Sequence, residues 1–407
     1  MLKLGFSKER LARIDRLLSE RYVQPGHIPC AQLIIARGGE VAYQSVTGLA
    51  DVARGTKAED DTLYRIYSMT KPLTSVALMM LWEEGAIALE DPVEKYIPEW
   101  KDLGVFAAGL PGGFVTTRPA RPMQVVDLLR HTSGLTYGFQ ARTNVDAAYR
   151  KLKIGEAPGE LTLAETVQAL ATIPLEFSPG EAWNYSVSTD IVGYLVQVVS
   201  GLPFEDFLRT RLTEPLKMVD TGFQVAAGQE GRLGACYWAR PDGGMRIGDD
   251  SVTSTYLKPP TFYSGGGGLV STAADYLRFC RMLANGGELD GARILAPATV
   301  RLMTANHLPG GGDLTQLSRS MFSESTYAGI GFGLGFATVF DPPQTLLPSS
   351  RGEYYWGGAA STAFWIDPVE DIQVVFMTQL MMSSTYPIRR ELRTMVYSAL
   401  MELSNSL

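Results

Sequence analysis

The tetrad Ser68–Lys71, a Ser-x-x-Lys sequence, is the segment of this chain best suited to covalent chemistry. No other lysine has a serine three residues before it. Residues three apart on a helix are neighbours, with about 5–6 Å between their Cβ atoms, so Lys71 can reach the Ser68 hydroxyl. A serine hydroxyl becomes a good nucleophile when a base takes its proton, and Lys71 is a candidate base. The tetrad therefore predicts nucleophilic catalysis that starts at Ser68.

A helix is predicted directly after the tetrad, from Pro72 to Gly85. Pro72 fits the first turn of a helix, where a missing N–H costs little. Ser68 is therefore expected at or just before the first helical residue, where the unpaired N–H groups of the helix start point at its hydroxyl. Apolar residues at helical spacing predict one buried stripe: Leu73, Val76, Ala77, Met80 and Leu81.

Two other segments could contribute polar groups to such a site. Tyr185 lies in a turn before a helix expected from Asp190, and a tyrosine there can project its hydroxyl into a cleft. Trp356–Gly358 precedes a strand expected at Ala359–Ile366, and glycines at a strand edge leave backbone N–H groups open to a ligand. Taken alone, each segment is more typical of structure: a common turn residue, or a β-bulge whose tryptophan packs in the core.

Other kinds of chemistry have less support. The three histidines show no metal-ligand spacing, so neither a metal nor a cofactor is expected. The three cysteines, Cys30, Cys236 and Cys280, are far apart, and we expect buried thiols in a reducing cytosol. His131 could belong to a rival catalytic triad, but Leu128–Gly134 is typical of a helix end capped by glycine.

The glycine-rich runs indicate no phosphate chemistry, and the elbow motif of another hydrolase class is missing. Neither Gly265–Gly268 nor Gly331–Gly335 has the spacing of a phosphate-binding loop, and both predict tight turns or close backbone contacts. No Gly-x-Ser-x-Gly elbow of the α/β-hydrolases is present.

Composition excludes several classes of partner. The chain has 407 residues, 45% of them hydrophobic, and a net charge of −7, which argues against nucleic acid and anionic membranes as partners. No apolar run is long enough to span a membrane, and the N-terminus lacks the apolar run of a signal peptide, so a cytoplasmic protein is expected. The N-terminal segment predicts a helix capped by Ser7, and the basic cluster Arg389, Arg390 and Arg393 predicts a solvated helix face.

The pattern of strands and helices indicates how these residues are positioned. Gln32–Arg37 and Glu40–Ser45 predict a hairpin around Gly38-Gly39, and Ile372–Thr378 predicts a strand near the C-terminus. A last helix is expected from Ser384 or Thr385. We predict an α/β (α+β) fold, in which both chain ends form one antiparallel sheet flanked by helices. The expected domains are 1–84 with 255–407, and an inserted, mainly helical domain at 85–254, with a ligand cleft between them.

Taken in order, Ser68–Lys71, Tyr185–Val187 and Trp356–Gly358 resemble the motifs of the serine β-lactamase and penicillin-binding-protein superfamily. The nearest resemblance is to its class C β-lactamase-like branch, the family VIII carboxylesterases. It covers nearly the whole chain, with supporting stretches at Leu128–Leu135, Phe177–Gly180, Gly267–Asp275 and Gly331–Gly335. The resemblance implies the β-lactamase/transpeptidase-like fold.

The resemblance also implies a role for each motif residue. Ser68 would be the acylated nucleophile, and Lys71 and Tyr185 would share the general-base role; which of the two is the neutral base stays open. The N–H groups of Ser68 and Ala359 would form the oxyanion hole. Trp356, Gly357, Gly358 and Val187 would contact the substrate.

Two departures from the lactamase pattern favour an esterase. Val187 replaces the asparagine of the second motif, and Trp356 replaces the lysine of the third. Losing an amide and a cation weakens the binding of anionic β-lactams, whereas apolar esters gain an aromatic wall. We expect a carboxylesterase for short-chain, small-molecule esters. The alternatives are a β-lactamase or D-Ala peptidase-like amidase, an acyltransferase with the same acyl-enzyme, and a non-catalytic binding module.

Overall fold

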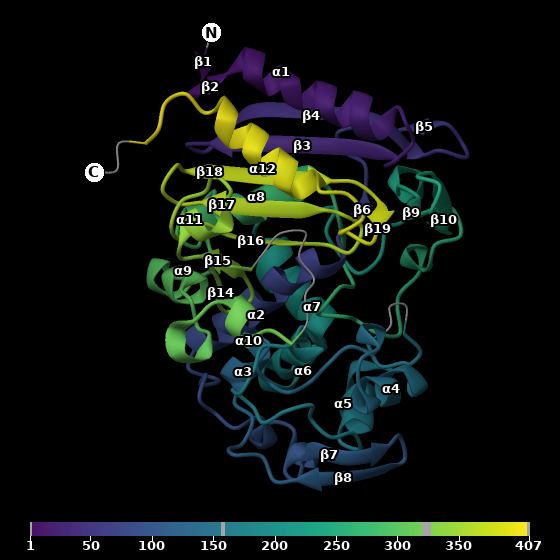
Figure 1. Ribbon diagram of the computed structural model, residues 1–407, viewed down its shortest axis with the longest axis vertical. Helices are drawn as coiled ribbons and strands as arrows, with labels where there is room; N and C mark the ends of the chain where they lie inside the picture. Colours follow the sequence, from purple (N-terminus) through teal and green to yellow (C-terminus); the bar gives the residue numbers. More distant parts are fainter. Residues whose placement is uncertain (1, 156–158, 320–326, 405–407) are drawn as a thin grey trace.

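The computed structural model describes residues 2–155, 159–319 and 327–404, and its centre is one antiparallel sheet (Figure 1). Strand β18 (Ile372–Met377) pairs with β3 (Cys30–Arg37), so the two ends of the chain meet in this sheet, as the sequence predicted. The expected hairpin of β3 and β4 (Glu40–Asp51) is also confirmed. The strand order is β14 (Ile330–Phe332), β15 (Ala337–Val339), β16 (Tyr354–Gly357), β17 (Ala363–Asp367), β18, β3, β4 and β5 (Thr56–Lys57).

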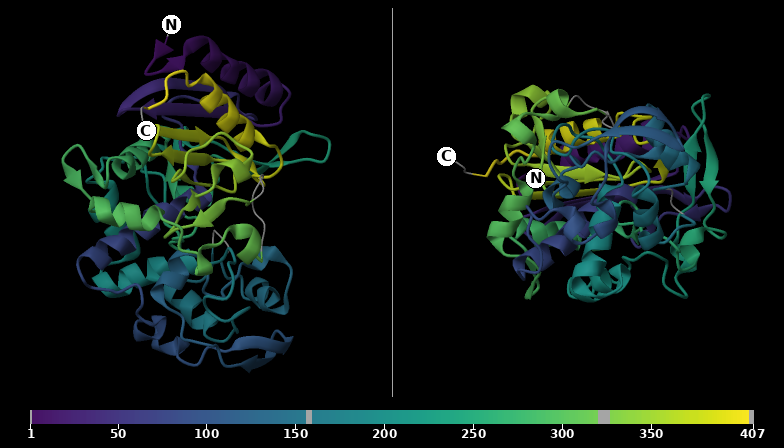
Figure 2. Two further views of the ribbon diagram at one scale, coloured as in Figure 1. Left: turned by 60° about the vertical axis from the view of Figure 1, so that its left-hand side comes forward. Right: turned by 90° about the horizontal axis from the view of Figure 1, so that it is seen from below.

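Helices cover both faces of the sheet (Figures 1 and 2). Because successive strand residues point to opposite faces, Leu33 and Ile35 pack under one helical layer, and Ile34 packs under the other. The first layer holds α1 (Lys8–Arg16), its π-helical extension Leu17–Val23 and α12 (Ile388–Ala399). Helix α8 (Ala273–Ala284) covers the other face. The predicted cap is present, since Ser7 Oγ accepts a hydrogen bond from the Arg10 N–H at 3.4 Å.

Two predicted boundaries were wrong. Residues 359–362, expected to begin a strand, form a turn instead, closed by a hydrogen bond from the Gly358 N–H to the Thr362 carbonyl, and β17 starts only at Ala363. The last helix begins at Ile388, directly after Pro387, and not at Ser384 or Thr385. Proline lacks a backbone N–H and is favoured at a helix start, so the helix begins where its ring can be accommodated.

The middle of the chain, which follows α2, is largely helical, as expected. It also contains a hairpin that the sequence did not predict. Its helices are α3 (Val125–Leu129), α4 (Asn144–Lys151), α5 (Leu163–Leu170), α6 (Ser188–Ser200) and α7 (Phe204–Leu208). The hairpin joins β7 (Val105–Leu110) to β8 (Gly113–Thr117). The domain boundaries at 84/85 and 254/255 stay a prediction. Strands β9 (Cys236–Ala239) and β10 (Met245–Asp249) precede the second boundary, and β9 pairs with β19 (Leu380–Met381).

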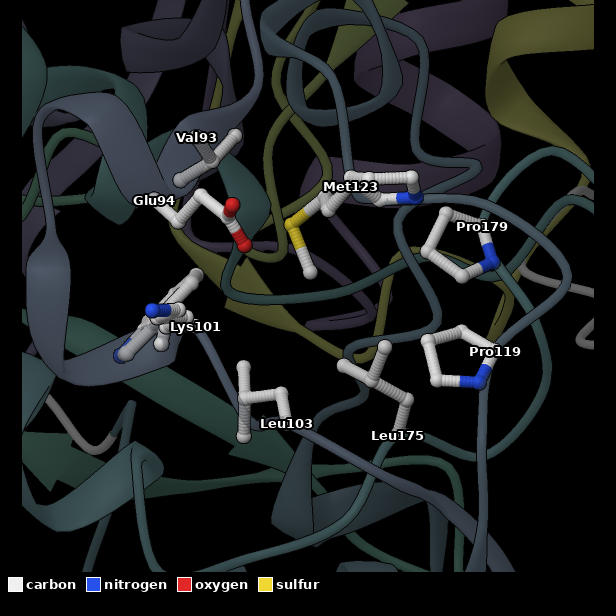
Figure 3. A pocket seen from close by; sticks show the side chains of 10 residues that line it. Val93, Glu94, Lys101, Leu103, Pro119, Met123, Leu175 and Pro179 are labelled. Atoms are coloured by element: carbon white, nitrogen blue, oxygen red, sulfur yellow. The ribbon is translucent and has the colours of Figure 1, made fainter.

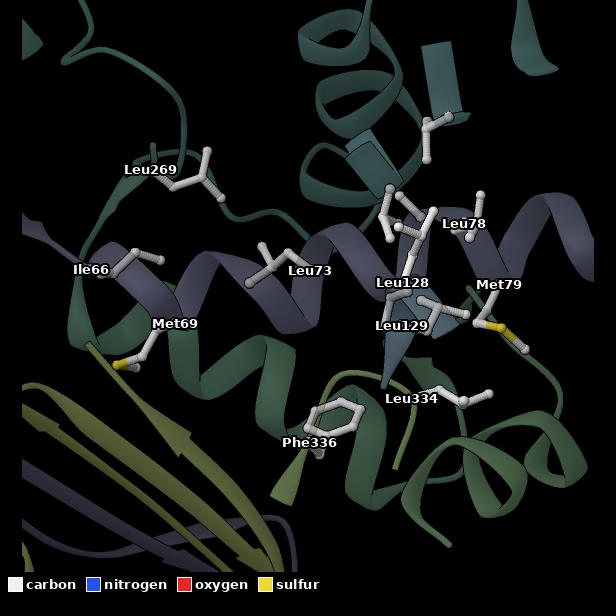
Figure 4. Packing of buried hydrophobic residues seen from close by; sticks show 14 of the residues in the cluster. Ile66, Met69, Leu73, Leu78, Met79, Leu128, Leu129, Leu269, Leu334 and Phe336 are labelled. Atoms are coloured by element: carbon white, nitrogen blue, oxygen red, sulfur yellow. The ribbon is translucent and has the colours of Figure 1, made fainter. Parts of the chain in front are cut away.

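Helix α2 (Thr70–Glu83) carries Lys71 and runs through the core (Figure 4). A single buried stripe was expected, but every side chain from Thr70 to Leu81 is buried. A helix that is surrounded on all sides is rigidly held, because core packing leaves its side chains little room to move. Among the described residues, no single helix is long and apolar enough to cross a membrane.

The remaining strands and α-helices are short. They are β1 (Leu2–Lys3), β2 (Phe6–Ser7), β6 (Tyr64–Arg65), β11 (Val270–Ser271), β12 (Glu288–Leu289), β13 (Ala292–Arg293), α9 (Pro297–Thr304), α10 (Leu314–Leu317) and α11 (Pro342–Thr345).

Candidate active site

Ser68 lies in a single 3₁₀ turn, Tyr67–Met69, that leads directly into α2. This is the position that the sequence predicted, just before the α-helix. The preceding residue, Tyr67, has a φ of +42°, a conformation that non-glycine residues rarely adopt. Such backbone strain is often found at functional sites. Ser68 is half-buried, whereas Lys71 is 2% exposed, so the nucleophile lies between the core and the surface.

The Lys71 amino group is enclosed by three oxygen atoms. Its Nζ lies 3.3 Å from Ser68 Oγ, 3.1 Å from the Tyr137 hydroxyl and 2.7 Å from the Gly266 carbonyl oxygen. It also lies 4.4 Å from the centre of the Tyr185 ring. The lysine is therefore held in one orientation, within hydrogen-bonding distance of the candidate nucleophile.

Tyr185 approaches Ser68 from the turn before α6. Its hydroxyl donates a hydrogen bond to Ser68 Oγ at 2.5 Å, and its side chain is 6% exposed. The rings of His131 and Trp356 flank it at 5.1 and 5.5 Å between centroids. Ser68, Lys71 and Tyr185, taken from two distant parts of the sequence, are thus brought together as predicted.

The third motif reaches the same place from the sheet. Strand β16 ends at Gly357, and a Cβ atom built on Gly358 would lie 2.4 Å from the Ile66 carbonyl oxygen. Only glycine permits this close approach, which sets the turn 358–362 against the turn that carries Ser68. No acceptor within the described part of the chain binds the Ala359 N–H. Its role in an oxyanion hole stays a prediction.

Arg389 holds this turn in place, a function that the sequence did not reveal. Its Nη2 donates to the carbonyl oxygens of Gly358 at 2.6 Å and Thr362 at 2.7 Å. Arg393 forms an ion pair with the buried carboxylate of Glu353. The predicted solvated helix face was therefore wrong for these two arginines, and of the cluster only Arg390 is exposed. Sequence periodicity cannot show that carbonyl groups from another element face the helix.

Of the four predicted substrate contacts, Trp356 and Val187 differ in their surroundings. Trp356 is half-buried and packs edge-on against Phe332, with ring centroids 5.4 Å apart. Val187 is fully buried, and its N–H donates to the Thr136 carbonyl at 3.2 Å. In this structure the Val187 side chain lies in the core, so its contribution to substrate binding stays a prediction.

Three further groups lie at the site without having been predicted. Tyr137 and Gly266 bind Lys71 directly, and Asp190 accepts a hydrogen bond from the Gly266 N–H at 2.9 Å. The expectation of close backbone contacts at Gly265–Gly268 is confirmed by the Gly266 carbonyl. Tyr137 follows the stretch Leu128–Leu135. It is 66 residues away from Lys71 in the sequence, and no local pattern predicts that the two side chains meet.

His131 is a structural neighbour of the site. It is 1% exposed, and its Nδ1 lies 3.2 Å from Ser186 Oγ. Burial, aided by the positive charge of Lys71, lowers its pKa well below the usual value. Helix α3 ends at Leu129, within the stretch Leu128–Gly134 that is typical of a helix end, and His131 adopts a φ of +58°. A neutral, buried imidazole supports the packing of Tyr185 and does not form a triad with Ser68 in this structure.

The cysteines and potential metal ligands among the described residues indicate no second kind of chemistry at the site. All three cysteines are buried and free, as expected, and burial raises the pKa of Cys30 to about 12 and that of Cys236 to about 11. In the described part of the chain, no group of three or more potential ligands could hold a metal ion.

Two hollows lie in the helical region. One, of about 560 Å³, lies between the β7–β8 hairpin, helix α4 and the segment 171–174 that follows α5. The other, of about 30 Å³, is lined by Leu103, Pro119 and Pro179 among others (Figure 3). Neither is lined by Ser68, Lys71 or Tyr185.

Comparisons with known proteins identify the family of this chain. The Beta-lactamase family model matches residues 15–395. Protein Rv1367c of Mycobacterium tuberculosis (strain ATCC 25618 / H37Rv) is 38% identical over 336 residues, which cover 82% of this chain and 81% of that protein. Esterase EstB of Burkholderia gladioli is 29% identical over 406 residues, which cover 95% of each chain.

A solved structure extends the comparison to the fold. EstCE1, described as a hydrolase with promiscuous acyltransferase activity, matches with a TM-score of 0.80 and 26% identity, over 96% of this chain and 99% of that chain. The predicted resemblance and the β-lactamase/transpeptidase-like fold, with its mixed helices and antiparallel sheet, are thereby confirmed. The chain therefore belongs to the Beta-lactamase family and is a serine hydrolase of that superfamily.

Proposed function

We propose that this protein is a carboxylesterase that hydrolyses short-chain acyl esters through an acyl-enzyme on Ser68. The observation that carries the proposal is the convergence of Lys71 Nζ and the Tyr185 hydroxyl on Ser68 Oγ, at 3.3 and 2.5 Å. Both distances are within reach for proton transfer, which requires a base close to the hydroxyl that it activates.

Ser68 Oγ attacks the ester carbonyl carbon while its proton passes to Lys71 or Tyr185. The tetrahedral oxyanion is stabilised by the N–H groups of Ser68 and Ala359. Its collapse breaks the bond to the alcohol, which leaves with a proton from the same pair. Water then attacks the acyl-enzyme and gives its proton to the pair. The bond between the acyl carbon and Ser68 Oγ breaks, the pair returns the proton to Ser68 Oγ, and the acid is released.

Lys71 and Tyr185 act as one unit in this scheme. Reference pKa values near 10 mean that holding either group deprotonated at pH 7 without help would cost about 4–5 kcal/mol. Both groups lie within hydrogen-bonding distance of Ser68 Oγ, so either can exchange the proton. The proton is therefore assigned to the pair and not to one member.

The preference for esters follows from the residues around this pair. Trp356 offers an apolar wall beside Tyr185, at the position where a lactamase has a lysine for the substrate carboxylate. The similarity to Esterase EstB over 95% of the chain supports the same activity.

A direct comparison of substrates tests the proposal. The kcat/KM for a short p-nitrophenyl ester should exceed that for a cephalosporin by at least about 10², which corresponds to about 2.7 kcal/mol. Slow cephalosporin turnover would fit, because the acylating groups are shared. Equal or higher efficiency on the cephalosporin would place the protein among the β-lactamases.

A second candidate activity is acyl transfer from the same intermediate. The specific observation is the similarity to EstCE1, whose description includes acyltransferase activity. An added alcohol should then compete with water for the acyl-enzyme, and a new ester should be detected by chromatography. Hydrolysis alone at high alcohol concentration would exclude this activity.

A further inference from the structure

Asp190 is a buried carboxylate close to the site, with no part in the scheme above. It lies in the first turn of α6 and is 1% exposed. Its Oδ1 accepts hydrogen bonds from the Ser264 hydroxyl at 2.6 Å and from the Gly266 N–H at 2.9 Å. A buried carboxylate is costly unless it is hydrogen-bonded and near an opposite charge, so its position calls for a partner.

Gly266 connects this carboxylate to Lys71. Its N–H binds Asp190, and its carbonyl oxygen accepts a hydrogen bond from Lys71 Nζ at 2.7 Å. A Cβ atom on Gly266 would lie 2.8 Å from Asp190 Oδ2 and 2.9 Å from the Tyr137 hydroxyl. Only glycine leaves room for the three side chains to surround this backbone.

The charges around this backbone are few. The titratable groups are Lys71 on α2, Asp190 on α6, and His131, Tyr137 and Tyr185 on the intervening segments. Burial raises the pKa of Asp190, whereas the Ser264 hydroxyl and the charge of Lys71 oppose that rise. His131 is neutral, because burial lowers its pKa. Among these groups, Lys71 and Asp190 are the pair that carries opposite charges when both are ionised.

We infer that Asp190 is a positioning residue that supplies the buried counter-charge of Lys71, acting through the backbone of Gly266. The inference rests on the proposed function, since it concerns the base that activates Ser68. The hydrogen bonds of Asp190 Oδ1 come from Ser264 and Gly266, and not from Ser68. It orients the Gly266 peptide that holds Lys71 Nζ, and it stabilises the ammonium form of the lysine electrostatically.

This role fixes the sign of one measurable change. A nearby negative charge raises the pH at which the Lys71–Tyr185 pair loses its first proton, whichever member releases it. Asp190→Asn removes the charge, while the amide oxygen can still accept both hydrogen bonds now made by Oδ1. The acid limb of the pH–rate profile should then move to lower pH by about one unit.

The first experiment measures the rate at which a fluorophosphonate labels Ser68 as a function of pH, in the wild type, Asp190→Asn and Asp275→Asn. Asp275 is a matched control, because it is also buried in the first turn of a helix and binds a backbone N–H, that of Asp220, at 2.8 Å. The shift is expected for Asp190→Asn alone. An unchanged limb in Asp190→Asn, or an equal shift in both variants, would overturn the inference.

The second experiment measures thermal stability and needs no activity. In the wild type, Asp190→Asn should lower Tm. In a Lys71→Met background the carboxylate has lost its opposite charge, so Asp190→Asn should raise Tm by at least about 2 °C. If Asp190→Asn alone fails to fold, the comparison of Lys71→Met with the double variant still applies, and a double variant less stable than Lys71→Met would refute the coupling.

These results separate the inference from the proposed function. A wild type that turns over the ester, with no limb shift in Asp190→Asn, would leave the esterase assignment intact and remove Asp190 from it. A wild type labelled at Ser68 that hydrolyses no ester would remove the esterase assignment. Even then, a shift of the acid limb in Asp190→Asn, together with a higher Tm when Asp190→Asn is added to Lys71→Met, would establish the Asp190–Lys71 pair.

Discussion

Gly358→Ala is the substitution for which the structure predicts the sharpest separation of catalysis from folding. The new Cβ would lie 2.3 Å from Thr362 Oγ1 and 2.4 Å from the Ile66 carbonyl oxygen. The threonine side chain can rotate away, but the Ile66 carbonyl is backbone and directly precedes the turn that carries Ser68. Since ordinary contacts of this kind are longer by about 1 Å, the turn 358–362 must move away from Ser68 by a comparable amount.

A displacement of that size is enough to spoil a catalytic geometry. Misplacing reacting groups by 1 Å can cost about 10² in rate, or about 2.7 kcal/mol, and the Ala359 N–H is the group that moves. We expect kcat on a short p-nitrophenyl ester to fall by about 10², with KM changed far less. Gly231→Ala is the matched control, because its Cβ would meet no atom within 4 Å.

The measurements are steady-state kinetics and thermal melting of both variants. Gly358→Ala should remain folded, with a lowered Tm, whereas Gly231→Ala should match the wild type in both respects. A Gly358→Ala enzyme with kcat within about twofold of the wild type would refute the reasoning, because the close approach of the third motif to Ser68 would then be dispensable.

Three further predictions follow from the site. Lys71→Ala and Tyr185→Phe should each lower kcat by at least about 10², and the double variant should be little worse than either; additive losses would show independent roles. Arg389→Met leaves two carbonyl groups without their charged donor, so kcat should fall about tenfold and Tm should drop, whereas exposed Arg390→Met should change neither; equal effects would show that the contacts of Arg389 do not hold the turn. Activity should survive thiol reagents, because all three cysteines are buried, and inactivation in step with thiol modification of the folded enzyme would contradict this.

Local patterns predicted the parts of the site that depend on local structure. The Ser-x-x-Lys spacing fixes which face of the helix start holds Ser68 and Lys71, so their 3.3 Å contact could be expected. The β3–β4 hairpin followed from its Gly-Gly turn, and the order of the three motifs identified the family. The stripe predicted for α2 was too narrow, because periodicity cannot distinguish a half-buried helix from one that the rest of the chain surrounds.

The parts that failed depend on contacts between distant segments. Arg389 looks like a solvent-facing residue on its own helix, and only the fold brings the carbonyls of Gly358 and Thr362 to it. Asp190 and Gly266 are 76 residues apart, and neither carries a local signal for the other. The start of β17 was misplaced because glycine-rich residues before a strand fit a turn and an extended edge equally well.

Labelling of Ser68 tests the central claim most directly. The protein would be treated with a fluorophosphonate ester and digested, and the modified peptide would be identified by mass spectrometry, with Ser68→Ala as the matched control. We predict a single phosphonyl group on Ser68, loss of ester hydrolysis in proportion to labelling, and a folded but unlabelled and inactive Ser68→Ala variant. Labelling of another residue with Ser68 untouched, or full ester hydrolysis by Ser68→Ala, would contradict the assignment of Ser68 as the nucleophile.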